Sequence, residues 1–245
     1  MDTPIEHITA DIEPALYLIP APLSAGDLDT VLPPENILLV KQVKHFIVEN
    51  VRTARRFLKQ CDRSIDIDSL TFSELNRHTD PRDYHAMLDP LAAGQSVGVI
   101  SEAGCPAIAD PGADIVAIAQ KRGYKVIPLV GPSSILLSLM ASGFNGQSFA
   151  FNGYLPIYKD QRAKAIKSMV NRIVHERQTQ IFIETPYRNN KLIAELASVL
   201  PGNMMLCVAS DITGRHQSIV TRSCSYWKGA RYDYDKVPTI FLLFS

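Results

Sequence analysis

The sequence predicts an α/β protein with two domains, a mostly parallel N-terminal sheet and a mixed C-terminal sheet. Up to about residue 145, short apolar runs alternate with helical patterns, which is typical of parallel βαβ units. Beyond that point the pattern becomes mixed. Of the 245 residues, 46% are hydrophobic, which is enough to bury a substantial core. We therefore predict domains at residues 1–146 and 147–245, with a ligand cleft between them.

The first domain begins with a polar arm at residues 1–13. Strand patterns follow at residues 15–19, 45–48, 70–75, 96–100 and 125–129. Helical patterns occupy residues 34–40, a basic stretch ending near Cys61, and residues 81–94, which begin at a proline and end at a glycine, with Pro90 as a candidate kink. A further helix ends at Gly123, and Ser133 or Ser134 is a suitable N-cap for the next one.

The second domain begins with residues 148–154, whose alternation predicts a half-exposed antiparallel strand. A long amphipathic helix follows at residues 160–176, and residues 189–200 form another helix. The residues of the long helix predicted to face inward are Ile166, Met169, Val170, Ile173 and Val174. Its basic face consists of Arg162, Lys164, Lys167 and Arg172. The remaining strands are predicted at residues 179–184, 206–209, 217–222 and 238–244.

Two loops rich in small residues, 101–112 and 131–134, follow predicted parallel strands. Ligands bind at the carboxyl ends of strands in such sheets. Neither a GxxxxGK[ST] nor a GxGxxG motif is present, which disfavours triphosphate and dinucleotide sites. The loops suit an adenosine compound held by main-chain bonds and apolar contacts, although tight turns that serve only packing are the alternative.

Composition narrows the class of protein. The chain has 25 basic and 25 acidic residues, so it has no global field for nucleic acid, although a local basic patch is compatible with this balance. Four scattered cysteines argue against structural zinc and for a reduced compartment. The histidines show no metal-ligand spacing, so we expect no metal site. We also expect no signal peptide, no membrane span and a cytoplasmic location.

Four motifs carry a resemblance to a known family: SEAGCPAIADPG at 101–112, GPSS at 131–134, NGYLP at 152–156 and ETPYR at 184–188. The segments LYLIPAPL at 16–23 and ENVRTARRFL at 49–58 match more loosely. The chain resembles the S-adenosylmethionine-dependent tetrapyrrole methylase superfamily, and within it the small-subunit ribosomal RNA (cytidine 2′-O) methyltransferases. The resemblance implies a tetrapyrrole-methylase-like fold, a cofactor cleft between the domains, ribosomal RNA or the small ribosomal subunit as partner, and a homodimer.

Carried over by position, the resemblance implies S-adenosylmethionine contacts from seven residues. They are Leu23, Cys105, Ile108, Ser133, Ser134, Ala209 and Thr239. The chain departs from the family pattern at four places: Ser24-Ala25 replaces Gly-Asn, Asn50-Val51 replaces Asp-Thr, Glu102 and Cys105 replace Asp and Thr, and Asp211 stands in a segment that usually reads Arg-Glu-Leu-Thr. These departures fall more on the substrate side than in the cofactor loops.

A ribose hydroxyl is a poor nucleophile, so methyl transfer to it benefits from a general base. Glu49 and Glu184 follow predicted strands, and Arg52 and Arg188 lie shortly after them. We predict that these four residues form the catalytic set. Glu102 and Asp211 are further carboxylates near the expected cleft. The alternatives are methyl transfer to a tetrapyrrole or another small molecule, and a non-catalytic protein that binds S-adenosylmethionine.

Overall fold

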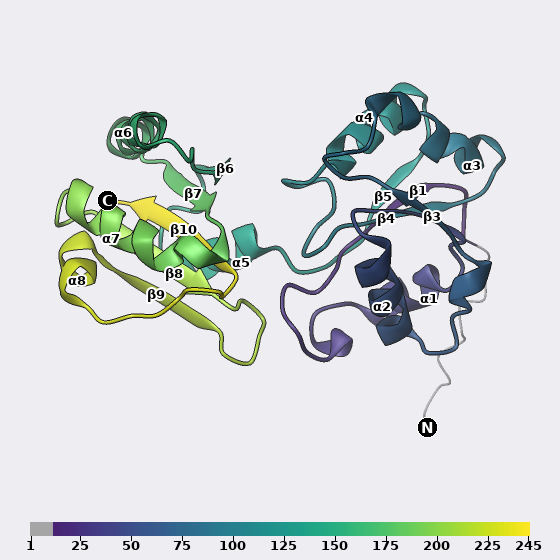
Figure 1. Ribbon diagram of the computed structural model, residues 1–245, viewed down its shortest axis with the longest axis horizontal. Coiled ribbons are helices and arrows are strands. Elements are labelled where there is room, and N and C mark those ends of the chain that lie inside the picture. The colour runs from purple at the N-terminus through teal and green to yellow at the C-terminus, as the bar shows by residue number, and fades with distance from the viewer. Residues whose placement is uncertain (1–11) are drawn as a thin grey trace. The chain divides into compact units, whose positions relative to one another are not determined.

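The computed structural model describes residues 12–245, so the predicted polar arm lies outside the described residues up to residue 11. The described chain divides into two compact units. The first unit comprises residues 12–22 and Asp27–Pro132, and the second comprises Leu23–Gly26 and Ser133–Ser245. Each unit contains one five-stranded sheet (Figure 1). The first unit ends at Pro132 and the second continues from Ser133. The domain limits at residues 1–146 and 147–245 stay a prediction.

The sheet of the first unit is parallel throughout, as the alternating pattern predicted. Its strands are β1 (Leu16–Ile19), β2 (His45–Val48), β3 (Thr71–Glu74), β4 (Val97–Ile100) and β5 (Val126–Pro128). They are arranged in the order β3-β2-β4-β1-β5. The loops that follow β4, β1 and β5 are therefore neighbours at the carboxyl edge of the sheet.

Helices cover both faces of this sheet (Figure 1). They are α1 (Pro34–Val40) and α2 (Val51–Cys61) on one face, and α3 (Asp89–Ala92) and α4 (Gly112–Lys121) on the other. Short 3-10 helices lie at η1 (Leu28–Thr30), η2 (Ile67–Ser69), η3 (Pro81–Asp83) and η4 (Ala86–Leu88). The single helix predicted over residues 81–94 is wrong, because η3, η4 and α3 are separate. Pro90 has no amide hydrogen to extend η4, and it stands in the first turn of α3, which begins at Asp89.

The second unit has a mixed sheet in the order β6-β7-β10-β8-β9. Its strands are β6 (Phe149–Tyr154), β7 (Thr179–Ile183), β8 (Met205–Ser210), β9 (Ser218–Ser223) and β10 (Thr239–Phe244). The prediction that residues 148–154 form an antiparallel strand is wrong, since β6 pairs with β7 in parallel. The reason is the long helix α6 (Lys159–Glu176) between these two strands. It carries the chain back across the sheet, so that β7 starts at the same end as β6 and runs in the same direction.

The helices of the second unit are α5 (Ser134–Ser142), α6 (Lys159–Glu176), α7 (Asn189–Val199) and α8 (Cys224–Gly229). A 3-10 turn, η5 (Pro186–Arg188), precedes α7. The first core lies between the sheet and α6, α7 and α8, and the second lies under α5. Ile166, Met169 and Ile173 of α6 are buried as predicted, and Val170 is half-buried. Val174, which was predicted to face inward, is 54% exposed, because it lies beyond the edge of the buried stripe.

No helix within residues 12–245 is both long enough and apolar enough to cross a membrane.

Candidate active site

The carboxylate of Asp110 holds the loop between β4 and α4 in shape. Its oxygens accept hydrogen bonds from the Ala107 amide at 2.9 and 3.0 Å and from the Gly112 amide at 2.7 Å. Ala107 and Ala109 have φ of 65° and 61°, a left-handed conformation that costs a residue with a Cβ about 1–2 kcal/mol. Strain of this kind concentrates at functional sites. Asp110 therefore closes this loop at the carboxyl end of β4, where a ligand site was predicted.

Contacts between the loops join the ends of β1, β4 and β5. Ala21 and Gly104 exchange two backbone hydrogen bonds of 2.9 and 3.0 Å, which link the loop after β1 to the loop after β4. The Cys105 thiol lies 3.6 Å from the carbonyl oxygen of Pro132 at the end of the loop after β5. Burial raises the pKa of this thiol, so the neutral form is favoured. Three loops of the first unit thus form one surface made largely of main chain.

Gly131 is required where the loop after β5 crosses the loop after β1. A Cβ at this position would lie 2.6 Å from the Cγ of Pro20, and a proline ring has little freedom to move away. We expect Gly131→Ala to lower the free energy of unfolding by about 1–3 kcal/mol, the usual cost of overpacking. Urea denaturation measures this loss. Gly146→Ala is the control, since nothing lies within 4 Å of its Cβ position; an equal effect of both variants would contradict the account.

Glu49 follows β2 directly and is half-buried. One of its oxygens accepts a hydrogen bond from the Glu102 amide at 3.3 Å. Burial is the main cause that raises the pKa of Glu49; the Glu102 amide opposes the rise, and the charges of Asp110 and Glu102 add to it. Burial also raises the pKa of Asp110, against the two amides that it holds. The cavity beside these carboxylates measures about 10 Å³, room for at most one water molecule. Glu49 thus combines a raised pKa with a single weak hydrogen bond, as expected of a general base.

Arg52 does not pair with Glu49. It is exposed, and the ion pairs found within residues 12–245 do not include these two side chains. Asn50, between them, caps α2 instead, because its side-chain oxygen accepts hydrogen bonds from the amides of Arg52 at 2.9 Å and Thr53 at 3.3 Å. Asn50 is therefore the N-cap of α2.

Glu184 and Arg188 do pair, in the second unit. The side chain of Glu184 is 2% exposed and that of Arg188 is 34% exposed. An Arg188 amino group donates to both Glu184 oxygens at 2.7 Å, and the Thr185 amide donates to the same carboxylate at 2.7 Å. Since both oxygens are occupied, the geometry fits a carboxylate that positions Arg188.

The predicted cofactor contacts are divided between the two units. Cys105 and Ile108 belong to the first unit, and Ile108 is 54% exposed. In the second unit, Leu23 is half-buried against the core that contains the fully buried Ala209 of β8. Leu23 and Ala209, which are far apart in the sequence, therefore belong to one core.

The polar members of this set have local partners. Ser133 caps α5, accepting a hydrogen bond from the Leu136 amide at 3.4 Å, and Ser134 is the first residue of that helix. Thr239 begins β10, and its hydroxyl donates to the Val237 carbonyl at 2.9 Å. The N-cap at Ser133 confirms one of the two positions predicted from the sequence.

Two of the departures from the family pattern contact each other. The Ser24 hydroxyl donates to Asp211 at 2.7 Å, and the His216 amide donates to the other oxygen of Asp211 at 2.8 Å. Asp211 also has φ of 47°, in the left-handed region. Asp211 therefore ties residues 23–26 to the loop after β8, and its carboxylate is already engaged.

Comparison with known proteins identifies the family. No protein-family profile matches the sequence. The chain is 31% identical over 207 residues to the ribosomal RNA small subunit methyltransferase I of Vibrio cholerae, covering 84% of this chain and 67% of that protein. The chain belongs to the ribosomal RNA small subunit methyltransferase I family. This confirms the family predicted from the motifs at residues 101–112, 131–134, 152–156 and 184–188.

Solved structures confirm the predicted fold of this methyltransferase I family member. Diphthine synthase superposes with a TM-score of 0.67 at 15% identity, covering 94% of this chain and 89% of that one. Uroporphyrin-III C-methyl transferase from Thermus thermophilus, complexed with S-adenyl homocysteine, gives a TM-score of 0.57 at 15% identity, covering 94% and 92%. At this identity the likeness concerns the fold alone.

One contributor to the site went unrecognised in the sequence. Asp110 stands directly before Pro111-Gly112, and Asp before such a pair is a turn signal. The turn signal at residues 110–112 could therefore have identified Asp110 as the residue that closes the loop.

Proposed function

We propose that this protein transfers a methyl group from S-adenosylmethionine to a ribose 2′-hydroxyl of small-subunit ribosomal RNA. The observation that carries the proposal is the 31% identity to a ribosomal RNA small subunit methyltransferase I over 84% of the chain. The fold likeness to a methyltransferase complexed with S-adenyl homocysteine supports the cofactor. Family resemblance further supports a homodimer, to be tested by light scattering, and a cytoplasmic location.

The loops after β1, β4 and β5 suit a zwitterionic adenosine compound. They offer backbone amides and carbonyls, the exposed apolar side chain of Ile108, and no phosphate-binding motif. We propose that Cys105 and Ile108 contact the cofactor from the first unit. We propose that the second unit contributes the remaining contacts, which are Leu23, Ser133, Ser134, Ala209 and Thr239.

The chemistry requires positioning and removal of one proton. S-adenosylmethionine supplies a methyl group that its sulfonium already makes electrophilic. The ribose oxygen forms a bond to the methyl carbon while the carbon–sulfur bond breaks, which leaves S-adenosylhomocysteine and a 2′-O-methyl ribose. Holding the reacting groups in line contributes about 7–11 kcal/mol. The hydroxyl proton goes to a carboxylate of the protein.

We assign that carboxylate to Glu49 rather than Glu184. The pKa of Glu49 is raised by burial, and the one hydrogen bond it accepts, from the Glu102 amide, is 3.3 Å long. Both oxygens of Glu184 are occupied by Arg188 and Thr185. Arg188, held by Glu184, and the exposed Arg52 then bind phosphates of the RNA, a role that the planar guanidinium suits.

The cofactor assignment has a test that does not depend on activity. Ile108→Ala is expected to weaken S-adenosylmethionine binding about tenfold, because part of an isoleucine side chain loses its apolar contact. The stability of the fold is expected to stay unchanged, since Ile108 is 54% exposed. Isothermal titration calorimetry measures the affinity. Leu38→Ala, at a 46% exposed position of α1, is the matched control. Tighter binding of NAD or ATP than of S-adenosylmethionine would overturn the assignment.

The acceptor is tested with labelled S-adenosylmethionine and three substrates offered separately: small-subunit ribosomal RNA, assembled small subunits, and a tetrapyrrole. Label in either ribosomal substrate supports the proposal. Label in the tetrapyrrole alone would establish the first alternative. Cofactor binding without transfer to any of the three would establish a non-catalytic protein.

A further inference from the structure

Large apolar side chains stand exposed on two loops of the second unit. Tyr154, the last residue of β6, is 62% exposed, and Ile157 and Tyr158 in the connection from β6 to α6 are 70% and 74% exposed. Tyr187 in η5 is 74% exposed. Because β6 and β7 are neighbouring parallel strands, the loops that follow them leave the sheet at the same edge. Tyr154, Ile157, Tyr158 and Tyr187 therefore all lie at or follow the carboxyl ends of two neighbouring strands of the second sheet.

These loops are held in place. Arg162 donates hydrogen bonds to the carbonyls of Pro156 and Ile157 at 3.3 and 3.1 Å and forms an ion pair with Glu195 of α7 at 2.9 Å. Arg162 thus fixes the chain beside Tyr158, and it is not part of a free basic face as predicted. The register of β6 shifts between Phe151 and Tyr154, where Gly153 has φ of 65°. A β-bulge of this kind redirects the side chain that follows it.

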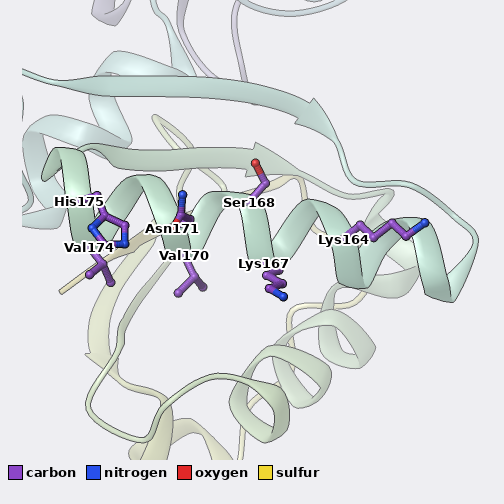
Figure 2. Close-up of a pocket in the computed structure, with 7 residues that line it drawn as sticks. All are labelled: Lys164, Lys167, Ser168, Val170, Asn171, Val174 and His175. Atoms are coloured by element: carbon purple, nitrogen blue, oxygen red, sulfur yellow. The ribbon is translucent and has the colours of Figure 1, made fainter.

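Helix α6 begins one residue after Tyr158, and its solvent face carries a row of hydrogen-bond donors. An open depression of about 570 Å³ is lined by Lys164, Lys167, Ser168, Val170, Asn171, Val174 and His175 (Figure 2). These seven residues include no carboxylate. From the first to the last, the row extends about 16 Å along the helix, given a rise of 1.5 Å per residue.

The sides of the row differ in chemistry. Ser168 and Asn171 lie on one side of the helix and Val170 and Val174 on the other (Figure 2). Neither lysine belongs to any ion pair found within residues 12–245. A surface with cations, neutral donors and a small apolar strip complements a strand that bears phosphates and riboses.

We infer that the second unit binds an unpaired RNA strand, with bases stacked on Tyr154, Tyr158 and Tyr187 and phosphates held along α6 by Lys164 and Lys167. The inference rests on the proposed function, since it specifies which form of RNA is recognised. Aromatic side chains accept bases that are not already stacked and paired. A duplex offers its phosphates but not its base faces. The tyrosines therefore select an unpaired segment, and the lysines contribute affinity without regard to sequence.

The phosphate contacts are tested by fluorescence anisotropy of the full chain with a short unpaired RNA oligonucleotide over a range of salt concentrations. Lys164→Gln combined with Lys167→Gln is expected to weaken binding and to reduce the slope of log K against log salt by about 1.4, at about 0.7 per phosphate contact. The control combines Lys191→Gln of α7 with Lys228→Gln of α8, two exposed lysines with the same change of charge. An equal change of slope in both pairs contradicts the inference.

The stacking contacts are tested with Tyr158→Leu and Tyr187→Leu, which keep apolar surface and remove the aromatic ring. Each is expected to weaken binding of the unpaired oligonucleotide about tenfold and to leave binding of a duplex unchanged. Tyr226→Leu of α8, where the tyrosine is 51% exposed, is the control. Equal affinity of the unmodified protein for duplex and unpaired RNA would overturn the inference. So would lysine and tyrosine variants that change the mass in light scattering but not RNA binding, because this surface would then be an interface between two copies.

Failure of this inference is distinguishable from failure of the proposed function, because the anisotropy assay needs neither cofactor nor methyl transfer. Methyl transfer to ribosomal RNA that is unaffected by the lysine and tyrosine variants contradicts the surface and keeps the function. Binding that depends on these residues, in a protein that methylates no RNA, supports the surface and contradicts the function.

Discussion

Glu49→Gln is expected to lower the rate of methyl transfer by about 10²–10⁴-fold, the usual contribution of a general base. The affinity for S-adenosylmethionine is expected to change little, because Glu49 is not among the predicted cofactor contacts. The rate of the unmodified enzyme should rise with pH through the raised pKa of Glu49, as the carboxylate becomes able to accept a proton. Single-turnover kinetics with labelled cofactor measure the rate, and the variant should lose this rise.

The same substitution is expected to stabilise the fold at neutral pH. The folded-state pKa of Glu49 lies above its unfolded value, which is about 4. Between these two values the folded protein binds more protons than the unfolded chain, so the free energy of unfolding falls as pH rises through this window. Glutamine removes the cost of the half-buried charge and retains an oxygen for the Glu102 amide. Glu49→Gln is therefore expected to stabilise the fold at pH values above the folded-state pKa of Glu49. Below the unfolded-state pKa it should have no such effect.

Glu74→Gln provides the matched control. Glu74 ends β3, the neighbour of β2, and is exposed. We expect this variant to keep its rate of methyl transfer and to show no stabilisation at neutral pH. Full activity of Glu49→Gln would remove Glu49 from the mechanism, and a loss as large in Glu74→Gln would show that the effect is not specific to the buried carboxylate.

Arg188→Met is expected to lower the free energy of unfolding by about 3 kcal/mol at neutral pH. The variant leaves the Glu184 carboxylate, 2% exposed, as an unpaired charge inside the second unit. Removing one partner of a buried ion pair costs about 3–5 kcal/mol, and the 34% exposure of Arg188 places this pair at the lower end. Urea denaturation of the full chain measures the loss.

Combining Arg188→Met with Glu184→Gln tests the cause. The double variant contains no buried charge, so we expect it to recover most of the stability lost by Arg188→Met alone. A neutral glutamine still accepts the hydrogen bond that the Thr185 amide now donates to Glu184. A double variant less stable than Arg188→Met would show that packing of the arginine, rather than the unpaired carboxylate, accounts for the loss.

Many strand and helix patterns were readable because they depend on local features. Apolar runs become buried parallel strands, such as Val97–Ile100. Asn50 and Ser133 begin helices because their side chains accept backbone hydrogen bonds. The exception is residues 81–94, where three short helical segments replace one predicted helix.

Other errors arise where residues far apart in the sequence determine the structure. The direction of β6 depends on its partner β7, and alternation within residues 148–154 does not specify a partner. The basic face predicted on α6 included Arg162, which instead pairs with Glu195 on another helix. The two predicted Glu–Arg pairs look alike in sequence, yet only Glu184 and Arg188 contact each other, because η5 brings them together while Asn50 begins α2.

The position of the transferred methyl group tests the central claim most directly. Small-subunit ribosomal RNA is incubated with the protein and labelled S-adenosylmethionine, then hydrolysed in alkali, which cleaves RNA only where the 2′-hydroxyl is free. The account predicts label in dinucleotides that resist alkali, and loss of that label with Glu49→Gln. Label in mononucleotides, which places the methyl group on a base, would contradict it.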